Sequence, residues 1–165
     1  MNKSPLISII IPCFNQGEYI QECINSINNS TIRDFEIIIV NDGSNDQHTL
    51  QILRELKNQE YNIINQRNKG PAAARNSGIK ISRGKLIVCI DADDIIESNF
   101  LKSMSKPFEG DPNLDLTYCD IRKIGYENGI FRMLEYSPYL LLFKNIIGSC
   151  SSMYKRKIWE KIGGY

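Results

Sequence analysis

The run Asp91-Ala92-Asp93-Asp94 contains the residue types most suited to chemistry in this chain. It places three carboxylates within four residues, and like charges at that spacing repel one another unless something compensates them. A divalent cation is the simplest compensation, because Mg²⁺ and Mn²⁺ prefer oxygen ligands and Mg²⁺ often combines one or two carboxylates with substrate phosphates. The alternative is a helix N-terminus capped by Asp93 or Asp94.

Polar clusters also follow two other apolar runs. Pro12-Cys13-Phe14-Asn15 follows residues 6–11, and Asn41-Asp42-Gly43-Ser44 follows residues 35–40. The second cluster is typical of an Asx turn, but Asp42 could also accept a hydrogen bond from a base or a ribose. Loops are not usually this acidic directly after an all-apolar strand, so the three clusters together indicate a site.

The elements that must position these clusters follow from hydrophobic periodicity. Apolar β-branched runs predict strands, and apolar residues at helical spacing predict helices. The predicted strands are 6–11, 35–40, 61–64, 86–90 and 114–119, with less regular ones near 131–133 and 151–154. The predicted helices start at residues 17, 47, 71, 99, 139 and 159, and the fifth of them is expected to cover 139–147.

Strands that alternate with helices predict one α/β domain over residues 1–165, with a mostly parallel central sheet between helices. Right-handed crossovers then place the carboxyl end of every strand at the same edge, where ligands of such sheets bind. The three polar clusters should therefore meet in one crevice.

Composition narrows the class of protein. The net charge of +1 argues against a nucleic-acid-binding surface, and the apolar runs are too short to span a bilayer. Five widely spaced cysteines without a CxxC pair argue against zinc and disulfides. Met1 to Pro5 leads directly into a strand without a signal peptide, which favours the cytoplasm. His48 is expected on a helix surface, and neither a dinucleotide-binding motif nor a P-loop is present.

The order of the motifs resembles that of the family-2 glycosyltransferases, which have the GT-A fold. The resemblance covers nearly the whole chain and rests on four segments, residues 8–15, 35–44, 68–78 and 91–94, with Gly163-Gly164-Tyr165 as a further similar segment. It implies a GT-A-like three-layer sandwich, a UDP- or GDP-type nucleotide-sugar donor, and Mn²⁺ or Mg²⁺.

The resemblance also implies roles for individual residues. Pro12 and Phe14 would border the base, and Asp42 would accept a hydrogen bond from it. Arg75 would lie near the donor, Asp91 would face the ribose or a metal-bound water, and Asp93 would ligate the metal together with Asp91. The donor-binding set is then Pro12, Phe14, Asn15, Asp42, Gly70, Arg75, Asp91 and Ala92.

Family members are typically inverting and need a carboxylate base for the acceptor hydroxyl. That base usually follows the segment that matches Gly163-Gly164-Tyr165, so we expect it beyond Tyr165, in a C-terminal part of the family domain that this chain lacks. Asp120 and Glu135 are weak substitutes. Two alternatives stay open, a sugar nucleotidyltransferase and a donor-binding fragment without catalysis.

The expected acceptor is a saccharide or a lipid-linked acceptor, in the synthesis of surface polysaccharide or glycan. A second copy of the chain is a candidate partner, whereas nucleic acid is not. The chain is expected either in the cytoplasm or peripherally at the inner face of the membrane.

Overall fold

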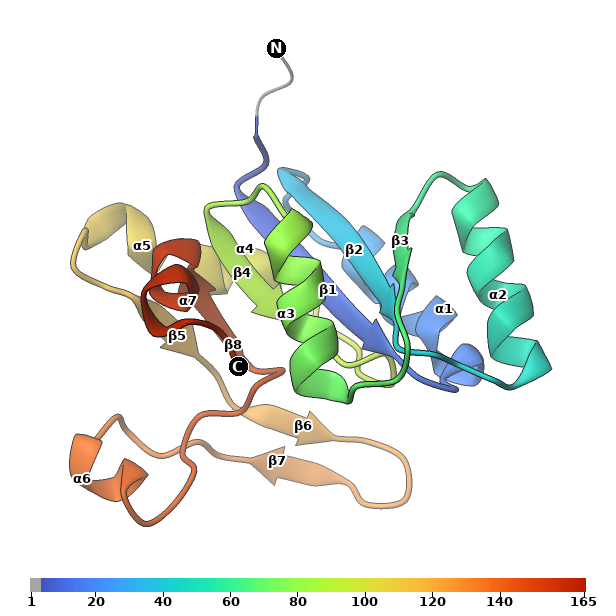
Figure 1. The fold of residues 1–165 in the computed structure, drawn as a ribbon. Helices are drawn as coiled ribbons and strands as arrows, with labels where there is room; N and C mark the ends of the chain where they lie inside the picture. The colour runs from blue at the N-terminus through green and yellow to red at the C-terminus, as the bar shows by residue number, and fades with distance from the viewer. Residues whose placement is uncertain (1–3) are drawn as a thin grey trace.

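The computed structural model describes residues 4–165 as a six-stranded sheet flanked by helices, with a separate two-stranded hairpin (Figure 1). The strands are β1 (Ile7–Cys13), β2 (Phe35–Asn41), β3 (Asn62–Asn65), β4 (Leu86–Cys89), β5 (Leu116–Tyr118), β6 (Ile121–Lys123), β7 (Gly129–Phe131) and β8 (Ser152–Lys155). The helices are α1 (Gly17–Asn28), α2 (Gln47–Asn58), α3 (Pro71–Ile81), α4 (Phe100–Ser105), α5 (Pro107–Gly110), α6 (Pro138–Leu141) and α7 (Arg156–Ile162).

The strand order β3-β2-β1-β4-β8-β5 confirms a mostly parallel central sheet. The strands β1 to β4 are parallel, because each is reached through a helical crossover. The chain adds β2 and β3 on one side of β1 and then returns to place β4 on the other side. This change of direction makes β1 and β4 the switch point, and ligands of such sheets bind at the carboxyl ends of the strands there.

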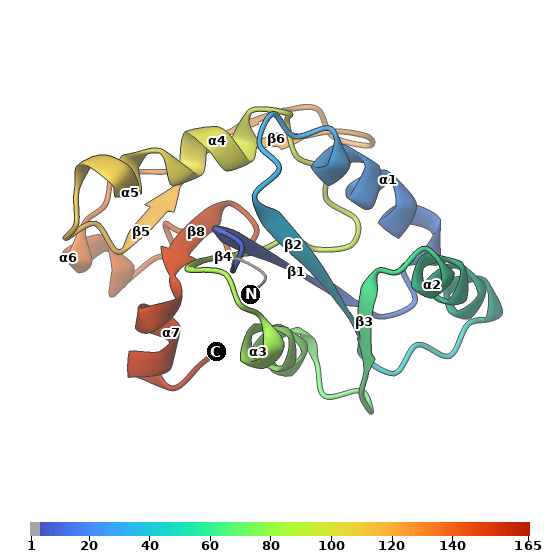
Figure 2. The same ribbon diagram turned by 90° about the horizontal axis from the view of Figure 1, so that it is seen from above.

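Both faces of the sheet are covered, as Figure 2 shows. On one face, α1, α2 and α4 pack against alternate residues of the central strands, including Ile9, Ile11 and Val88. On the other face, α3 and α7 pack against residues that include Ile10 and Ile87. The central strands are apolar on both faces because helices bury both sides of the sheet.

Three sequence predictions need correction. β8 pairs antiparallel with β4 and with β5, so its carboxyl end does not lie at the same edge as those of β1 to β4. The predicted helix 139–147 is only α6, which ends at Leu141. The strand predicted at 131–133 is β7, which pairs with β6 in a hairpin. Of the segment Met1 to Pro5, which precedes the first predicted strand, the first three residues lie outside the described part of the chain.

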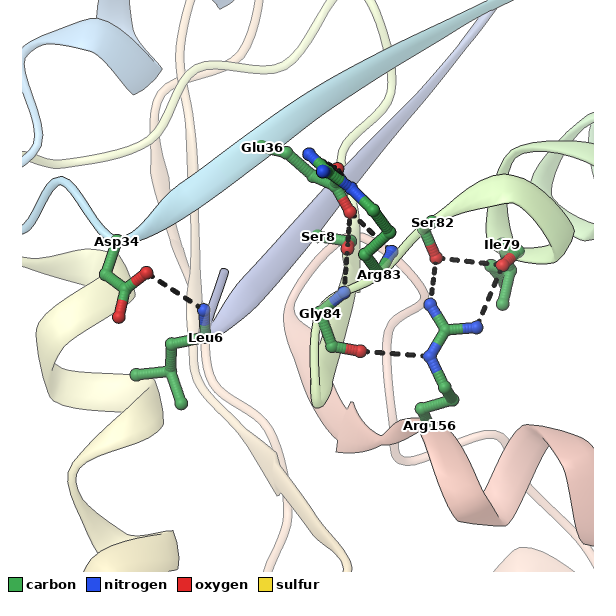
Figure 3. Close-up of polar contacts among 9 residues, drawn as sticks. All are labelled: Leu6, Ser8, Asp34, Glu36, Ile79, Ser82, Arg83, Gly84 and Arg156. Carbon is green, nitrogen blue, oxygen red and sulfur yellow. Dashed lines mark hydrogen bonds and ion pairs between the residues drawn. The ribbon is translucent and has the colours of Figure 1, made fainter. Parts of the chain in front are cut away.

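The amino-terminal edge of the sheet is held by a polar network (Figure 3). The Ser8 hydroxyl donates to Glu36 at 2.6 Å and accepts from the Gly84 amide at 2.8 Å. Burial acts to raise the pKa of Glu36, but hydrogen bonds from Ser8 and Arg83 outweigh it and lower that pKa. Arg156 donates to the carbonyls of Gly84 and Ile79 and thereby ties the start of α7 to the last turn of α3 and to the segment that follows it.

Among residues 4–165, no helix combines the length and the apolar character that crossing a bilayer requires.

Candidate active site

The three polar clusters lie at the carboxyl ends of neighbouring strands, as the sequence predicted. Cys13 at the end of β1 is in register with Asn41 at the end of β2, and the Asp42 amide donates to the Cys13 carbonyl at 2.8 Å. On the other side of β1, Cys89 at the end of β4 is in register with Ile10. The run Asp91 to Asp94 therefore begins two residues beyond β4, at the switch point of the sheet.

Asn15 joins the first two clusters. Its φ of 55° lies in the left-handed region, which asparagine tolerates better than most residues. Its side-chain oxygen accepts from the amide of Asn45 at 2.9 Å, and its own amide donates to the Ser44 hydroxyl at 3.0 Å. Pro12 is partly buried, whereas Phe14 is 42% exposed and free to contact a ligand. Asn15 thus shapes the loop that presents Phe14.

The Asp42 carboxylate is buried and fully engaged with the loop between β3 and α3. One oxygen accepts from the Gln66 side chain at 2.7 Å and from the Lys69 amide at 2.9 Å, and the other accepts from the Gly70 amide at 2.8 Å. Gly70 has a φ of 85°, a conformation that favours glycine. Asp42 therefore positions the loop that leads into α3 at Pro71.

Arg75 of α3 and Asp91, which follows β4, form an ion pair, with 2.6 Å between an Arg75 guanidinium nitrogen and an Asp91 carboxylate oxygen. Only 12% of the Arg75 side chain is exposed, compared with 36% for Asp91. Burial acts to lower the pKa of Arg75, but the hydrogen bond and charge of Asp91 outweigh it and raise that pKa. Arg75 therefore stays charged next to the acidic cluster.

Asp91, Asp94 and Cys150 could hold a metal ion, since one ligand atom from each lies within 4.8 Å of the others. Burial raises the pKa of Asp94, and the charges of Asp91 and Asp93 raise it further. Burial and the charge of Asp94 also raise the pKa of the Cys150 thiol, to about 12. Two carboxylates this close together, of which only Asp91 has a cationic partner, fit a divalent cation of the Mg²⁺ or Mn²⁺ type.

The other residues of this run differ in exposure. Asp93 is exposed and does not belong to the group of three, although it follows Asp91 by two residues. Ala92 is only 2% exposed and packs in the core, so its side chain has little surface for a ligand. The resemblance implies Asp91 and Asp93 as metal ligands, whereas the structure gathers Asp91 with Asp94.

Sequence reasoning missed Cys150 and Gln66. Cys150 belongs to no cysteine motif in the sequence, but it is only partly buried and shares a side-chain hydrogen bond with Asp94. Gln66 had no motif of its own, because its role depends on the pairing of β2 with β3. Of the two candidate substitutes for a base, Asp120 accepts from the Met133 amide and pairs with Arg132, while Glu135 is exposed.

A cavity of about 460 Å³ lies elsewhere, at the amino-terminal edge of the sheet, and Leu6, Leu86 and Phe108 are among its lining residues. None of the residues of the three polar clusters lines it. Its size therefore does not mark the candidate site, which is defined by polar groups that converge at the opposite edge.

The sequence matches the family described as Glycosyl transferase family 2 over residues 8–163, and the chain belongs to this family. It is 36% identical over 146 residues to an uncharacterized glycosyltransferase of Methanocaldococcus jannaschii, a match that covers 86% of this chain and 50% of that protein. It is also 34% identical over 132 residues to the hyaluronan synthase of Pasteurella multocida, which covers 79% of this chain and 14% of the synthase.

Solved structures confirm the fold as GT-A. A mannosyltransferase from Pyrobaculum calidifontis, in complex with GDP-Man and Mn²⁺, superposes with a TM-score of 0.73 at 19% identity, covering 99% of this chain and 48% of that one. Staphylococcus aureus TarS 1–349, in complex with UDP-GlcNAc, gives a TM-score of 0.74 at 23% identity, covering 95% of this chain and 47% of that one. The chain thus spans about half the length of the mannosyltransferase and of the M. jannaschii relative.

Proposed function

We propose that this chain binds a nucleotide-diphosphate sugar, of the UDP or GDP type, together with Mn²⁺ or Mg²⁺, and supplies the donor side of an inverting glycosyl transfer. The observation that carries the proposal is the meeting of Arg75, Asp91 and Asp94 at the switch point of a family-2 fold. Solved neighbours of this fold bind GDP-Man with Mn²⁺ or UDP-GlcNAc, which supports the same classes of donor here.

In this proposal the base of the nucleotide lies between Phe14 and the loop that Asp42 holds. The diphosphate lies near Arg75, whose charge favours an anion, and the acidic run faces it. Asp91 and Asp94, with Asp93 beside them, would hold the divalent cation. When bound, such a cation stabilises the negative charge that develops on a departing diphosphate.

The acceptor is a saccharide or a lipid-linked acceptor, and the pathway is the synthesis of a surface polysaccharide or glycan. Relatives named as hyaluronan and chondroitin synthases support a polysaccharide product. We place the catalytic base beyond Tyr165, since Asp120 is engaged with Met133 and Arg132. The donor-binding domain would then cover residues 1–165, as one part of a longer family domain.

Isothermal titration calorimetry of the chain with UDP and GDP, with Mn²⁺ or with EDTA, tests the proposal. We expect one nucleotide to bind about tenfold or more tightly with Mn²⁺, because the metal joins protein carboxylates to phosphate oxygens. Asp91→Asn and Asp94→Asn should each remove that metal dependence.

Asp111→Asn serves as the matched control, because Asp111 follows α5 and takes no part in the strand-end clusters. It should bind as the unsubstituted chain does. Absence of metal-dependent binding for every nucleotide sugar would overturn the proposal. Release of pyrophosphate from a nucleoside triphosphate and a sugar phosphate would instead favour a nucleotidyltransferase, although residues 12–17 lack the glycine-rich basic loop that such enzymes usually show.

A further inference from the structure

The segment that follows α7 returns to α3 and ends beside the candidate site. α7 stops at Gly163, whose φ of 89° gives the left-handed end that glycine favours. Figures 1 and 2 both show the end of the chain lying close to α3. Residues far apart in the sequence are thereby brought next to Arg75.

Asn76 holds this segment against α3. Its side-chain oxygen accepts from the Trp159 ring nitrogen at 2.8 Å and from the Tyr165 amide at 3.0 Å, and its side-chain nitrogen donates to the Tyr165 carbonyl at 3.2 Å. A Cβ at Gly164 would come within 2.8 Å of the same oxygen. The close approach at Gly164 thus lets one asparagine fix the backbone of Tyr165.

The ring of Tyr165 lies against the Arg75 guanidinium, whose central carbon is 5.7 Å from the ring centroid. Tyr165 is 48% exposed as a whole residue, but its hydroxyl reaches the interior. There it accepts from the Tyr154 hydroxyl at 3.2 Å and lies 3.8 Å from the sulfur of Cys89, a fully buried residue. The ring is therefore held at both its backbone and its hydroxyl.

Arg75 is thus confined from two sides. Asp91 binds one terminal nitrogen at 2.6 Å, and the Tyr165 ring covers the guanidinium from another side. The Nε atom of Arg75 is buried without a hydrogen-bond partner among the described residues. The ring and Asp91 together therefore determine where the guanidinium lies.

We propose that Tyr165 is a positioning residue for the donor site, which acts by stacking on Arg75 and so fixes the Arg75–Asp91 pair where the nucleotide diphosphate binds. This inference rests on the proposed function for its ligand, but the stacking itself is a property of the free protein. Cation–π contacts of this geometry stabilise a guanidinium most where it is desolvated, as Arg75 is here.

The test compares Tyr165→Leu with Tyr165→Phe in the 165-residue chain. Tyr165→Leu removes the ring, and we expect the dissociation constant for UDP or GDP with Mn²⁺ to rise about three- to tenfold. Tyr165→Phe keeps the ring and should bind nearly as the unsubstituted chain does. Ile162→Ala is the matched control, because Ile162 lies in the same region, is 70% exposed and does not contact Arg75.

A second readout needs no ligand. The NMR resonance of the Arg75 Nε–H group in the free protein should shift in Tyr165→Leu, because the ring current is lost, and should stay in place in Ile162→Ala. Three results would each overturn the inference. They are unchanged nucleotide binding in Tyr165→Leu, a loss of affinity in Tyr165→Phe equal to that in Tyr165→Leu, and an unmoved Arg75 resonance in Tyr165→Leu. Failure of the unsubstituted chain to bind any nucleotide would instead refute the proposed function, and the resonance would still decide whether the ring holds Arg75.

Discussion

At the scale of a single residue, the Asp42 carboxylate organises a whole loop. It is 3% exposed and accepts from two backbone amides and one side-chain amide of residues 66–70. Backbone amides that lose a buried acceptor have no ready substitute, so the cost of removing a carboxylate here exceeds the value of one ordinary hydrogen bond. The loop in turn sets the start of α3 and hence the place of Arg75.

Asp42→Ala should lower the free energy of unfolding by about 2–4 kcal/mol, because three hydrogen bonds to a buried carboxylate are lost together. Urea denaturation followed by circular dichroism measures this change. Asp42→Asn keeps one acceptor oxygen and should fall between Asp42→Ala and the original chain. Glu55→Gln, on the exposed face of α2, is the control and should change stability by less than about 0.5 kcal/mol. If Asp42→Ala left the free energy of unfolding unchanged, the loop would not depend on this residue.

The roles of single residues were the hardest feature to predict from the sequence. Asp42, Arg75 and Asp91 were chosen as site residues, and they do lie at the edge where the clusters meet. Their actual partners could not be predicted, because the contacts of Asp94 with Cys150 and of Arg75 with Tyr165 join residues that only the fold brings together. A partly buried cysteine and an aromatic residue carry no local pattern that marks such roles.

At the scale of an element, α3 lies unusually close to the sheet at Gly78. A Cβ there would come within 2.5 Å of Ile10 Cγ2 and 3.1 Å of Val40 Cγ2. Both are branched side chains in central strands, so they have few alternative rotamers. The glycine lets α3 pack directly on β1 and β2, which places Arg75 within reach of Asp91.

Gly78→Ala should therefore destabilise the protein by about 1–2 kcal/mol, because overpacking outweighs the gain of about 1 kcal/mol that alanine brings to a helix. Thermal or urea denaturation checks the sign. Gly110→Ala is the matched control, since a Cβ at Gly110 meets nothing within 4 Å. If Gly78→Ala were as stable as the original chain, α3 would have room that the structure does not show.

Elements with a strong pattern were predicted well. The runs that became β1, β2 and β4 are continuously apolar because the sheet is covered on both faces. Asp46 caps α2 by accepting from the Thr49 amide, and the predicted start of this helix at residue 47 is confirmed. The predicted helix 139–147 was wrong because most of its apolar residues are exposed, Phe143 at 88%, and only Ile146 is buried, at 2%. The first strand of the β6–β7 hairpin was missed because its three residues are too few to show an alternation of apolar and polar side chains.

At the scale of the whole molecule, large apolar side chains are concentrated on the surface of residues 124–143. They include Tyr139, Leu142 and Phe143, which are 78%, 76% and 88% exposed. In Figure 1 this region, with β6, β7 and α6, lies beyond the carboxyl ends of the strands. Exposed apolar surface of this kind promotes association and dye binding.

Replacing Tyr139, Leu142 and Phe143 together by serine should reduce the fluorescence of bound anilinonaphthalene sulfonate, a dye that reports exposed apolar surface. The free energy of unfolding should change by less than about 1 kcal/mol, because these side chains lie outside the core. Ile81→Ser, on the exposed end of α3, is the control and should leave the fluorescence unchanged. A large loss of stability in the triple variant would show that the three side chains pack against the rest of the protein.

The position of β8 has a consequence for the order in which the chain can assemble during translation. β4 gains its second neighbour only through residues 152–155, more than sixty residues later in the chain, and β5 joins the sheet only through β8. Until those residues leave the ribosome, the apolar strand Leu86–Cys89 has an open edge. The nascent chain thus carries an apolar strand with an unpaired edge until the segment that pairs with that edge has emerged.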